Sequence, residues 1–154
     1  MDQIRPWLFI GKYRDTLQSD DLLSDSIRAM LQLAVKLEQP GITSLYLSVE
    51  DFAPLNFDLL DQGIAFIREQ KKLGNNILVA CWAGINRSST FCTAALKEED
   101  GLSLFDAFKE VKNAHPESMP HELVWESLCE YYGESIPYID IMRHGQNGYG
   151  KLFD

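Results

Sequence analysis

The chain has 154 residues, 45% of them apolar and 24% charged, which is the balance expected of one globular domain. Its net charge is −9 and its basic residues are scattered, so it lacks the Lys/Arg clusters with which proteins bind nucleic acid or anionic membranes. No apolar run reaches the roughly 20 residues that cross a bilayer, and Pro6 interrupts the start too early for a signal peptide, so we expect a cytoplasmic protein.

The first half of the chain alternates short apolar runs with polar turns. In order, it predicts a strand at 7–10, a helix capped by Asp20 or Asp21, a strand at 29–34 and a strand at 42–49. Asn56 is expected to cap a longer helix whose apolar residues recur at helical spacing and which ends near Gly74.

The second half predicts a buried strand and then helices. The expected elements are a strand at 77–80, a helix at 88–99, a helix capped by Ser103, and a last helix from Pro120 to Gly133. Residues after about 136 are rich in glycine and are interpreted as an irregular tail.

This alternation indicates an α/β fold: a single domain over residues 1–154, with a central, mostly parallel sheet of four to five strands and helices on both faces. In such sheets, ligands bind where the carboxyl ends of strands meet the N-termini of helices. The segment 81–87, between the strand at 77–80 and the next helix, lies in that position.

Segment 81–87 carries the chemistry. A loop in this position can direct its backbone N–H groups inward around an oxyanion, and the following helix N-terminus adds to the positive field. Cys81 begins the segment, where such a field favours the nucleophilic thiolate, and Arg87 ends it with a planar fork suited to two phosphate oxygens. Gly84 allows a backbone conformation that a side chain would hinder.

These residues resemble the Cys-x5-Arg signature of the protein tyrosine phosphatase superfamily, whose motif H-C-x-x-G-x-x-R-S/T stands here as A-C-W-A-G-I-N-R-S at 80–88. The dual-specificity branch is the most similar, and the likeness covers roughly residues 5–133. It implies a phosphotyrosine phosphatase-like fold and hydrolysis of phosphate monoesters through a phospho-cysteine intermediate, without a metal or other cofactor. The loop positions that the resemblance assigns to phosphate binding are Trp82, Ala83, Gly84, Ile85, Asn86 and Arg87.

The resemblance also implies a general acid about 30 residues before the cysteine, and Asp51 occupies that place. Leaving-group departure needs such an acid, because expelling an alkoxide or phenoxide is slow unless its oxygen is protonated. The alternative is that Asp51 only solvates a turn; its neighbour Glu50 is a competitor that strand alternation should direct elsewhere. Ser88 is implied to hydrogen-bond the cysteine and ease release of the phospho-enzyme, or it is a plain helix-cap serine.

One departure from the family pattern concerns the residue before the nucleophile, which is usually histidine and here is Ala80. We expect a less strongly activated cysteine and low intrinsic activity. The main alternative is therefore a phosphate-binding pseudophosphatase with weak or no turnover. Sulfur transfer and arsenate reduction also use a cysteine in an anion-binding loop, but their loop positions or missing upstream acid fit this sequence less well.

The neutral loop and acidic chain argue against phosphoinositide or RNA substrates, so we expect a phosphorylated protein or a small phosphate ester. A shallow pocket is expected, lined by Trp82, Ile85, Phe52 and Leu55, unless these side chains pack in the core. Cys92 and Cys129 fit the pattern of small buried residues, and a disulfide between Cys81 and Cys92 is disfavoured by the helical rise. His115, His121 and His144 lack a surrounding motif and are assigned no role. The sequence leaves the physiological substrate and the oligomeric state open.

Overall fold

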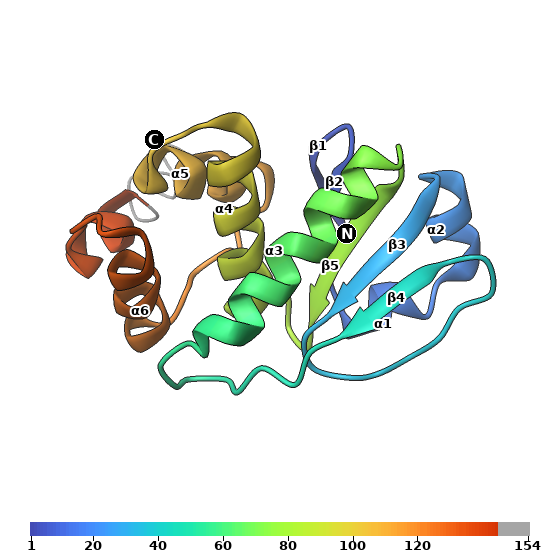
Figure 1. Ribbon diagram of the computed structural model, residues 1–154, viewed down its shortest axis with the longest axis horizontal. Helices are drawn as coiled ribbons and strands as arrows, with labels where there is room; N and C mark the ends of the chain where they lie inside the picture. Colours follow the sequence, from blue (N-terminus) through green and yellow to red (C-terminus); the bar gives the residue numbers. More distant parts are fainter. Residues whose placement is uncertain (145–154) are drawn as a thin grey trace, which may run out of the picture.

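Five strands form one sheet in the order β1-β2-β5-β3-β4 (Figure 1). The computed structural model describes residues 1–144. The strands are β1 (Asp2–Arg5), β2 (Leu8–Lys12), β3 (Ile27–Gln32), β4 (Thr43–Tyr46) and β5 (Asn76–Cys81). Only β1 pairs antiparallel among these strands; the pairs β2–β5, β5–β3 and β3–β4 are parallel. The expectation of a mostly parallel sheet of four to five strands is confirmed.

Helices cover both faces of this sheet, as expected. They are α1 (Tyr13–Thr16), α2 (Ser19–Ser24), α3 (Phe57–Lys72), α4 (Arg87–Asp100), α5 (Leu104–Ala114) and α6 (Glu122–Tyr132). Figure 1 shows α3 and α4 on one face, α5 and α6 outside α4, and α1 and α2 on the opposite side of the strands. Among the helices of the described residues, none is long and apolar enough to cross a membrane.

The alternation of side chains along β5 divides the core between the two faces. Ile77, Val79 and Cys81 belong to the large apolar cluster under α3 and α4. Leu78 and Ala80 belong to the smaller cluster on the side of α2. Cys81 and Ala80 therefore face opposite sides of the sheet, because successive residues of a strand do so.

Several expected helix ends are confirmed by their caps. The Asn56 side chain accepts hydrogen bonds from the Asp58 and Leu59 amides, and Ser103 accepts one from Asp106. Gly101 ends α4 in the left-handed region with φ 66°, where a glycine has no Cβ to clash. These local signals predict helix ends well because their partners lie within three residues in the chain.

Other expected boundaries are wrong. β3 runs over Ile27–Gln32 instead of 29–34, and β4 covers only Thr43–Tyr46 of the expected 42–49. β1 lies outside the expected elements altogether, because four residues carry too little periodicity to predict a strand. The N-cap of α2 is Gln18, and the two aspartates expected there lie in the first turn.

The predicted irregular tail is wrong for its first part. Residues 138–144 are helical, and Ile141 is fully buried in the large core cluster. Ile136 and Tyr138 also pack against this cluster. The glycine-rich composition of the residues that follow did not indicate this packing. Gly145, Gly148 and Gly150, on which the tail prediction rested, lie outside the described residues.

Candidate active site

Cys81 is the last residue of β5, and its side chain is buried at the start of the loop 81–87. Its Sγ accepts a hydrogen bond from the Gly84 amide at 3.2 Å and lies 3.2 Å from Ser88 Oγ. The strand holds the sulfur in place while a backbone N–H and a hydroxyl, both able to donate, face it. Such partners stabilise a thiolate.

The loop after Cys81 holds its carbonyl groups away from the sulfur. The Trp82 oxygen accepts from the Tyr13 amide, and the Ile85 oxygen from the Met119 amide. The Asn86 oxygen accepts from Thr90 inside α4. With these carbonyls engaged by surrounding elements, the Gly84 amide donates to Cys81 Sγ inside the loop, as an N–H of an anion-binding nest would.

Gly84 permits this tight loop. Its φ is +71°, and a Cβ built on it would lie 3.0 Å from the Gly11 carbonyl oxygen in β2. Both the left-handed backbone and the close approach of β2 therefore exclude a larger residue. The expectation of a conformational need for glycine here is confirmed.

Arg87 is the first residue of α4, and its guanidinium is held by carbonyls that follow two other strands. Nη1 donates to Leu33 O at 3.2 Å and to Val49 O at 2.9 Å. Nε is buried and has no hydrogen-bond partner among residues 1–144. A buried donor left open in a fork that is otherwise anchored is well placed for an incoming oxyanion.

Asp51 lies in the loop between β4 and α3, beside Arg87. Its Oδ2 is 3.5 Å from Arg87 Nη2, and its Oδ1 accepts a hydrogen bond from the Asn86 side chain at 2.5 Å. Glu50, the competitor, is exposed. The structure thus brings the expected acid, the arginine and the cysteine loop to one edge of the sheet.

The exposed apolar side chains near this edge include three of the four expected pocket residues. Trp82 is 61% exposed and stacks on Tyr13, with ring centroids 5.2 Å apart. Phe52 and Ile85 are also exposed. Leu55 is the exception: it packs in the core, the alternative that the sequence left open, and its amide donates to Ser127 Oγ in α6, so it does not line the pocket.

His115, to which the sequence assigned no role, contacts the back of the cysteine loop. Its Nε2 donates to Gly84 O at 2.7 Å, and its Nδ1 is 2.5 Å from Asp2 Oδ2. A metal ion could be held by three residues whose ligand atoms lie within 4.8 Å of one another: Asp2, His115 and Glu117. His115 itself lies close to both carboxylates, with Nδ1 beside Asp2 and Nε2 3.1 Å from Glu117 Oε2. No local motif marks His115, because its partners lie 31 and 113 residues away in the chain.

Cys92 lies in α4 beneath the site and is fully buried. Burial raises the pKa of its thiol well above the ordinary value, and the nearby Cys81 raises it further. Both cysteines are free thiols. A buried, protonated thiol is a poor nucleophile, so Cys92 behaves as a small apolar residue.

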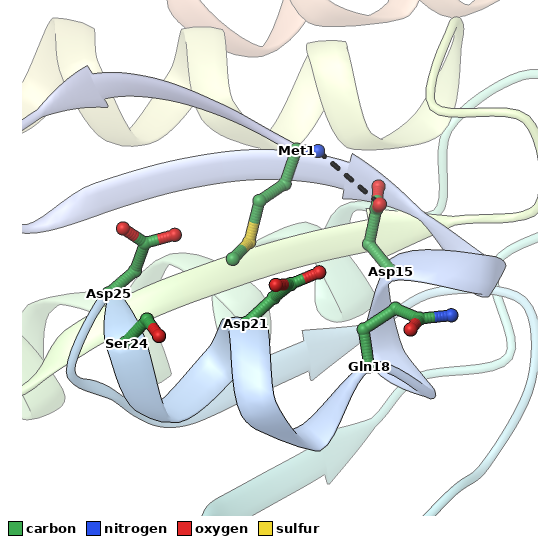
Figure 2. A pocket seen from close by; sticks show the side chains of 6 residues that line it. All are labelled: Met1, Asp15, Gln18, Asp21, Ser24 and Asp25. Carbon is green, nitrogen blue, oxygen red and sulfur yellow. Dashed lines mark ion pairs between the residues drawn. The ribbon is translucent and has the colours of Figure 1, made fainter.

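Two polar hollows lie near the N-terminus. One, of about 160 Å³, is lined by Met1, Asp15, Gln18, Asp21, Ser24 and Asp25, and Figure 2 shows the Met1 amine directed at Asp15. The other, of about 170 Å³, adjoins Ala83 and Gly84 on the His115 side. The first hollow contains none of the expected site residues. The second is lined by residues of β2 and by His115, and does not include Leu33 or Val49, which hold Arg87.

The family model described as "Dual specificity phosphatase, catalytic domain" matches residues 8–134. The chain belongs to this family. The expected superfamily, its dual-specificity branch and the phosphatase class of the domain are therefore confirmed.

Individual relatives of the chain are also named dual specificity phosphatases. The chain is 31% identical to human dual specificity phosphatase 28 over 137 residues, covering 84% of this chain and 76% of that protein. The crystal structure of that protein has a TM-score of 0.80, at 28% identity, and covers 85% of this chain and 94% of its own. Human dual specificity protein phosphatase 8 is 28% identical over 136 residues, 85% of this chain but only 22% of its own length.

A further structural neighbour is titled human tyrosine phosphatase-like serine/threonine/tyrosine-interacting protein. Its crystal structure has a TM-score of 0.80 at 26% identity and covers 86% of this chain and 95% of its own. The dual-specificity fold is thus shared by proteins named as phosphatases and by one named only as phosphatase-like.

Proposed function

We propose that this dual specificity phosphatase domain hydrolyses phosphate monoesters through a phospho-cysteine intermediate on Cys81. The observation that carries the proposal is that one loop begins with Cys81, whose Sγ accepts from the Gly84 amide, and ends with Arg87, whose guanidinium contacts Asp51. The substrate class that the family implies is a phosphorylated protein or a small phosphate ester. Phosphotyrosine and phosphoserine/threonine both remain within this proposal.

In the first step, the Cys81 thiolate attacks phosphorus and an S–P bond forms as the P–O bond to the leaving group breaks. Arg87 and the loop amides bind the equatorial oxygens, where charge is greatest in the transition state. Asp51 gives its proton to the leaving oxygen. The contact of Asp51 with Arg87 supports an acid beside the arginine that would bind the phosphoryl group.

In the second step, water attacks the phospho-cysteine, Asp51 takes the proton from that water, and the S–P bond breaks. Asp51 acts as an acid in the first step and as a base in the second, because the second step transfers the phosphoryl group in the opposite direction, from sulfur to oxygen. Ser88 Oγ, 3.2 Å from Sγ, donates to the departing thiolate and so eases its release.

The alternative is a phosphate-binding pseudophosphatase, and Ala80 is the observation that favours it. Ala80 faces the α2 side of the sheet with Phe9, Leu22, Ile27, Met30 and Leu78, so this position supplies no polar group near Cys81. The Cys81 sulfur keeps its donors from Gly84 and Ser88. We therefore expect slow turnover rather than none.

Hydrolysis of an aryl phosphate by the wild type, Cys81→Ser and Asp51→Asn tests the proposal. Cys81→Ser should reduce hydrolysis to the uncatalysed rate, and Asp51→Asn should reduce kcat by roughly 10²–10⁴-fold. Rapid quenching in acid should trap a labelled phospho-cysteine in the wild type. Equal rates for wild type and Cys81→Ser would exclude Cys81 as nucleophile; phosphate binding without turnover would support the pseudophosphatase.

A further inference from the structure

Asn86 joins three parts of the site through its side chain, which is buried in the cysteine loop. Its Oδ1 accepts a hydrogen bond from the His121 amide at 2.7 Å. A backbone N–H can only donate, so this contact fixes which end of the carboxamide is oxygen. The NH2 end must then face Asp51, and Nδ2 donates to Asp51 Oδ1 at 2.5 Å.

We propose that Asn86 is a positioning residue that selects which oxygen of Asp51 delivers the proton. The proposal rests on the proposed role of Asp51 as general acid. A carbonyl oxygen accepts a hydrogen bond better than a hydroxyl oxygen does, so the N–H that Asn86 gives to Oδ1 favours the protonated form in which Oδ1 is the carbonyl oxygen. The acid proton is therefore carried by Oδ2, the oxygen that lies 3.5 Å from Nη2 of Arg87, the residue proposed to bind the phosphoryl group.

The loop that carries Asp51 needs such an anchor. Residues 47–56 form no regular strand or helix, and Phe52, next to the acid, has a φ of +57° that non-glycine residues rarely adopt. Asn86 belongs instead to the loop that also holds the nucleophile. Its hydrogen bond fixes the acid relative to the sulfur, and orientation of this kind contributes strongly to rate.

His121 completes the arrangement from the other side. Its backbone N–H holds Asn86, and its ring meets the Phe52 ring edge-on with centroids 5.3 Å apart. The start of α6 thus contacts both the residue that binds the acid and the residue that follows the acid. Asp51 is held through Asn86 on one side and through Phe52 on the other.

The test uses the full chain and a series of aryl phosphates whose leaving groups range from strongly to weakly acidic phenols. Asn86→Ala removes both hydrogen bonds. Asn86→Asp, measured at pH 7.5, keeps an oxygen for the His121 amide but offers a carboxylate instead of a donor to Asp51. Both variants should lose roughly 10- to 100-fold in kcat with the poorest leaving group and less than about 3-fold with the best, because only the poor one needs the proton.

Ser89→Ala is the matched control. Ser89 is also buried, and its hydroxyl donates to the Ile85 carbonyl of the same loop, whereas the Asn86 amide donates to Asp51. A general disturbance of the loop should change the rates of all leaving groups by the same factor in this variant. Thermal unfolding of each variant checks that it is folded.

Combination with Asp51→Asn separates the outcomes. Adding Asn86→Ala to that variant should leave its dependence on the leaving group unchanged, because the acid is already absent. If Asp51→Asn alone does not steepen the dependence, the proposed acid is wrong. If Asp51→Asn steepens it while both folded Asn86 variants behave like Ser89→Ala, the acid stands and the role of Asn86 is refuted.

Discussion

Ala80 and Cys81 are neighbours in β5 whose side chains enter different parts of the protein. Cys81 reaches the loop and the large cluster, whereas Ala80 packs in the small cluster on the α2 side. A cavity of only about 10 Å³ lies beside the two residues, lined also by Gln32 and Tyr13. Beside the buried Ala80 there is therefore little room for a larger side chain.

Ala80→His should therefore destabilise the protein rather than simply restore the family motif. Overpacking a closed core costs about 1–3 kcal/mol, so the free energy of unfolding in urea should fall by that amount. The rate of aryl phosphate hydrolysis, measured on the folded fraction, reports separately whether the imidazole activates Cys81. An unchanged or increased free energy of unfolding would show that the pocket accepts the ring and contradict this prediction.

At the scale of elements, the contact between α3 and α4 positions the helix that begins with Arg87. Gly63 in α3 is buried, and a Cβ on it would lie 2.5 Å from Phe91 Cε1 in α4. The missing side chain lets the Phe91 ring pack directly against the α3 backbone. The two helices approach closely only because position 63 carries no side chain.

Gly63→Ala distinguishes helix propensity from packing by the sign of its effect. Propensity alone would stabilise α3 by about 1 kcal/mol. The clash with Phe91 should outweigh that gain, giving a net loss of about 1–3 kcal/mol in the free energy of unfolding. Gln62→Ala, at the exposed neighbouring position, is the control and should change it by less than about 0.5 kcal/mol. A net gain for Gly63→Ala would mean that the helices separate without cost.

At the scale of the whole molecule, the N-terminal strand and the connection between α5 and α6 meet behind the cysteine loop. Asp2 in the edge strand β1 and Glu117 after α5 both contact His115, which in turn donates to Gly84 O. The Gly84 amide faces Cys81 Sγ. One side chain thus connects the N-terminal strand, the α5–α6 connection and the loop that holds the nucleophile.

His115→Ala should lower kcat/KM for an aryl phosphate by roughly 10-fold and reduce the melting temperature. Its removal leaves the Gly84 carbonyl without its donor, and a buried unsatisfied group costs about 1–3 kcal/mol. His115→Gln can still place an N–H near that carbonyl and should recover part of both losses. Wild-type kcat/KM and melting temperature in His115→Ala would contradict the proposed support.

His144, in the helical segment 138–144, couples stability to pH. Burial lowers the pKa of its imidazole below the ordinary value, and the positive charges of Lys109 and Lys112 lower it further. The ring also meets Phe105 and Phe108 edge-on. The folded state therefore binds the proton of His144 less readily than the unfolded state does. The contribution of His144 to stability is complete when the pH is above its pKa in the unfolded chain, and it is lost as the pH falls through its pKa in the folded protein.

The free energy of unfolding should therefore decrease between pH 7.5 and pH 5.5, and His144→Gln should show a smaller decrease over the same interval. Urea titrations at the two pH values measure the difference. A variant whose decrease equals that of the wild type would assign the pH dependence to other groups.

The sequence by itself determined the parts of the site that lie within one short segment. Cys81, Gly84, Arg87 and Ser88 fall between a buried strand and a helix, and strand, loop and helix follow from patterns only a few residues long. The helix caps at Asn56 and Ser103 were predictable for the same reason, since a cap and its partner are neighbours in the chain.

Only the tertiary structure decided which distant side chains meet this segment. Asn86 binds Asp51 across 35 residues, His115 binds Asp2 across 113, and Leu55 packs in the core although the sequence placed it at the pocket. Residues 138–144 formed a helix whose Ile141 is buried in the core, where composition had predicted an irregular tail. Local patterns determine which elements form, whereas these contacts depend on how the elements pack, and no spacing along the chain records that packing.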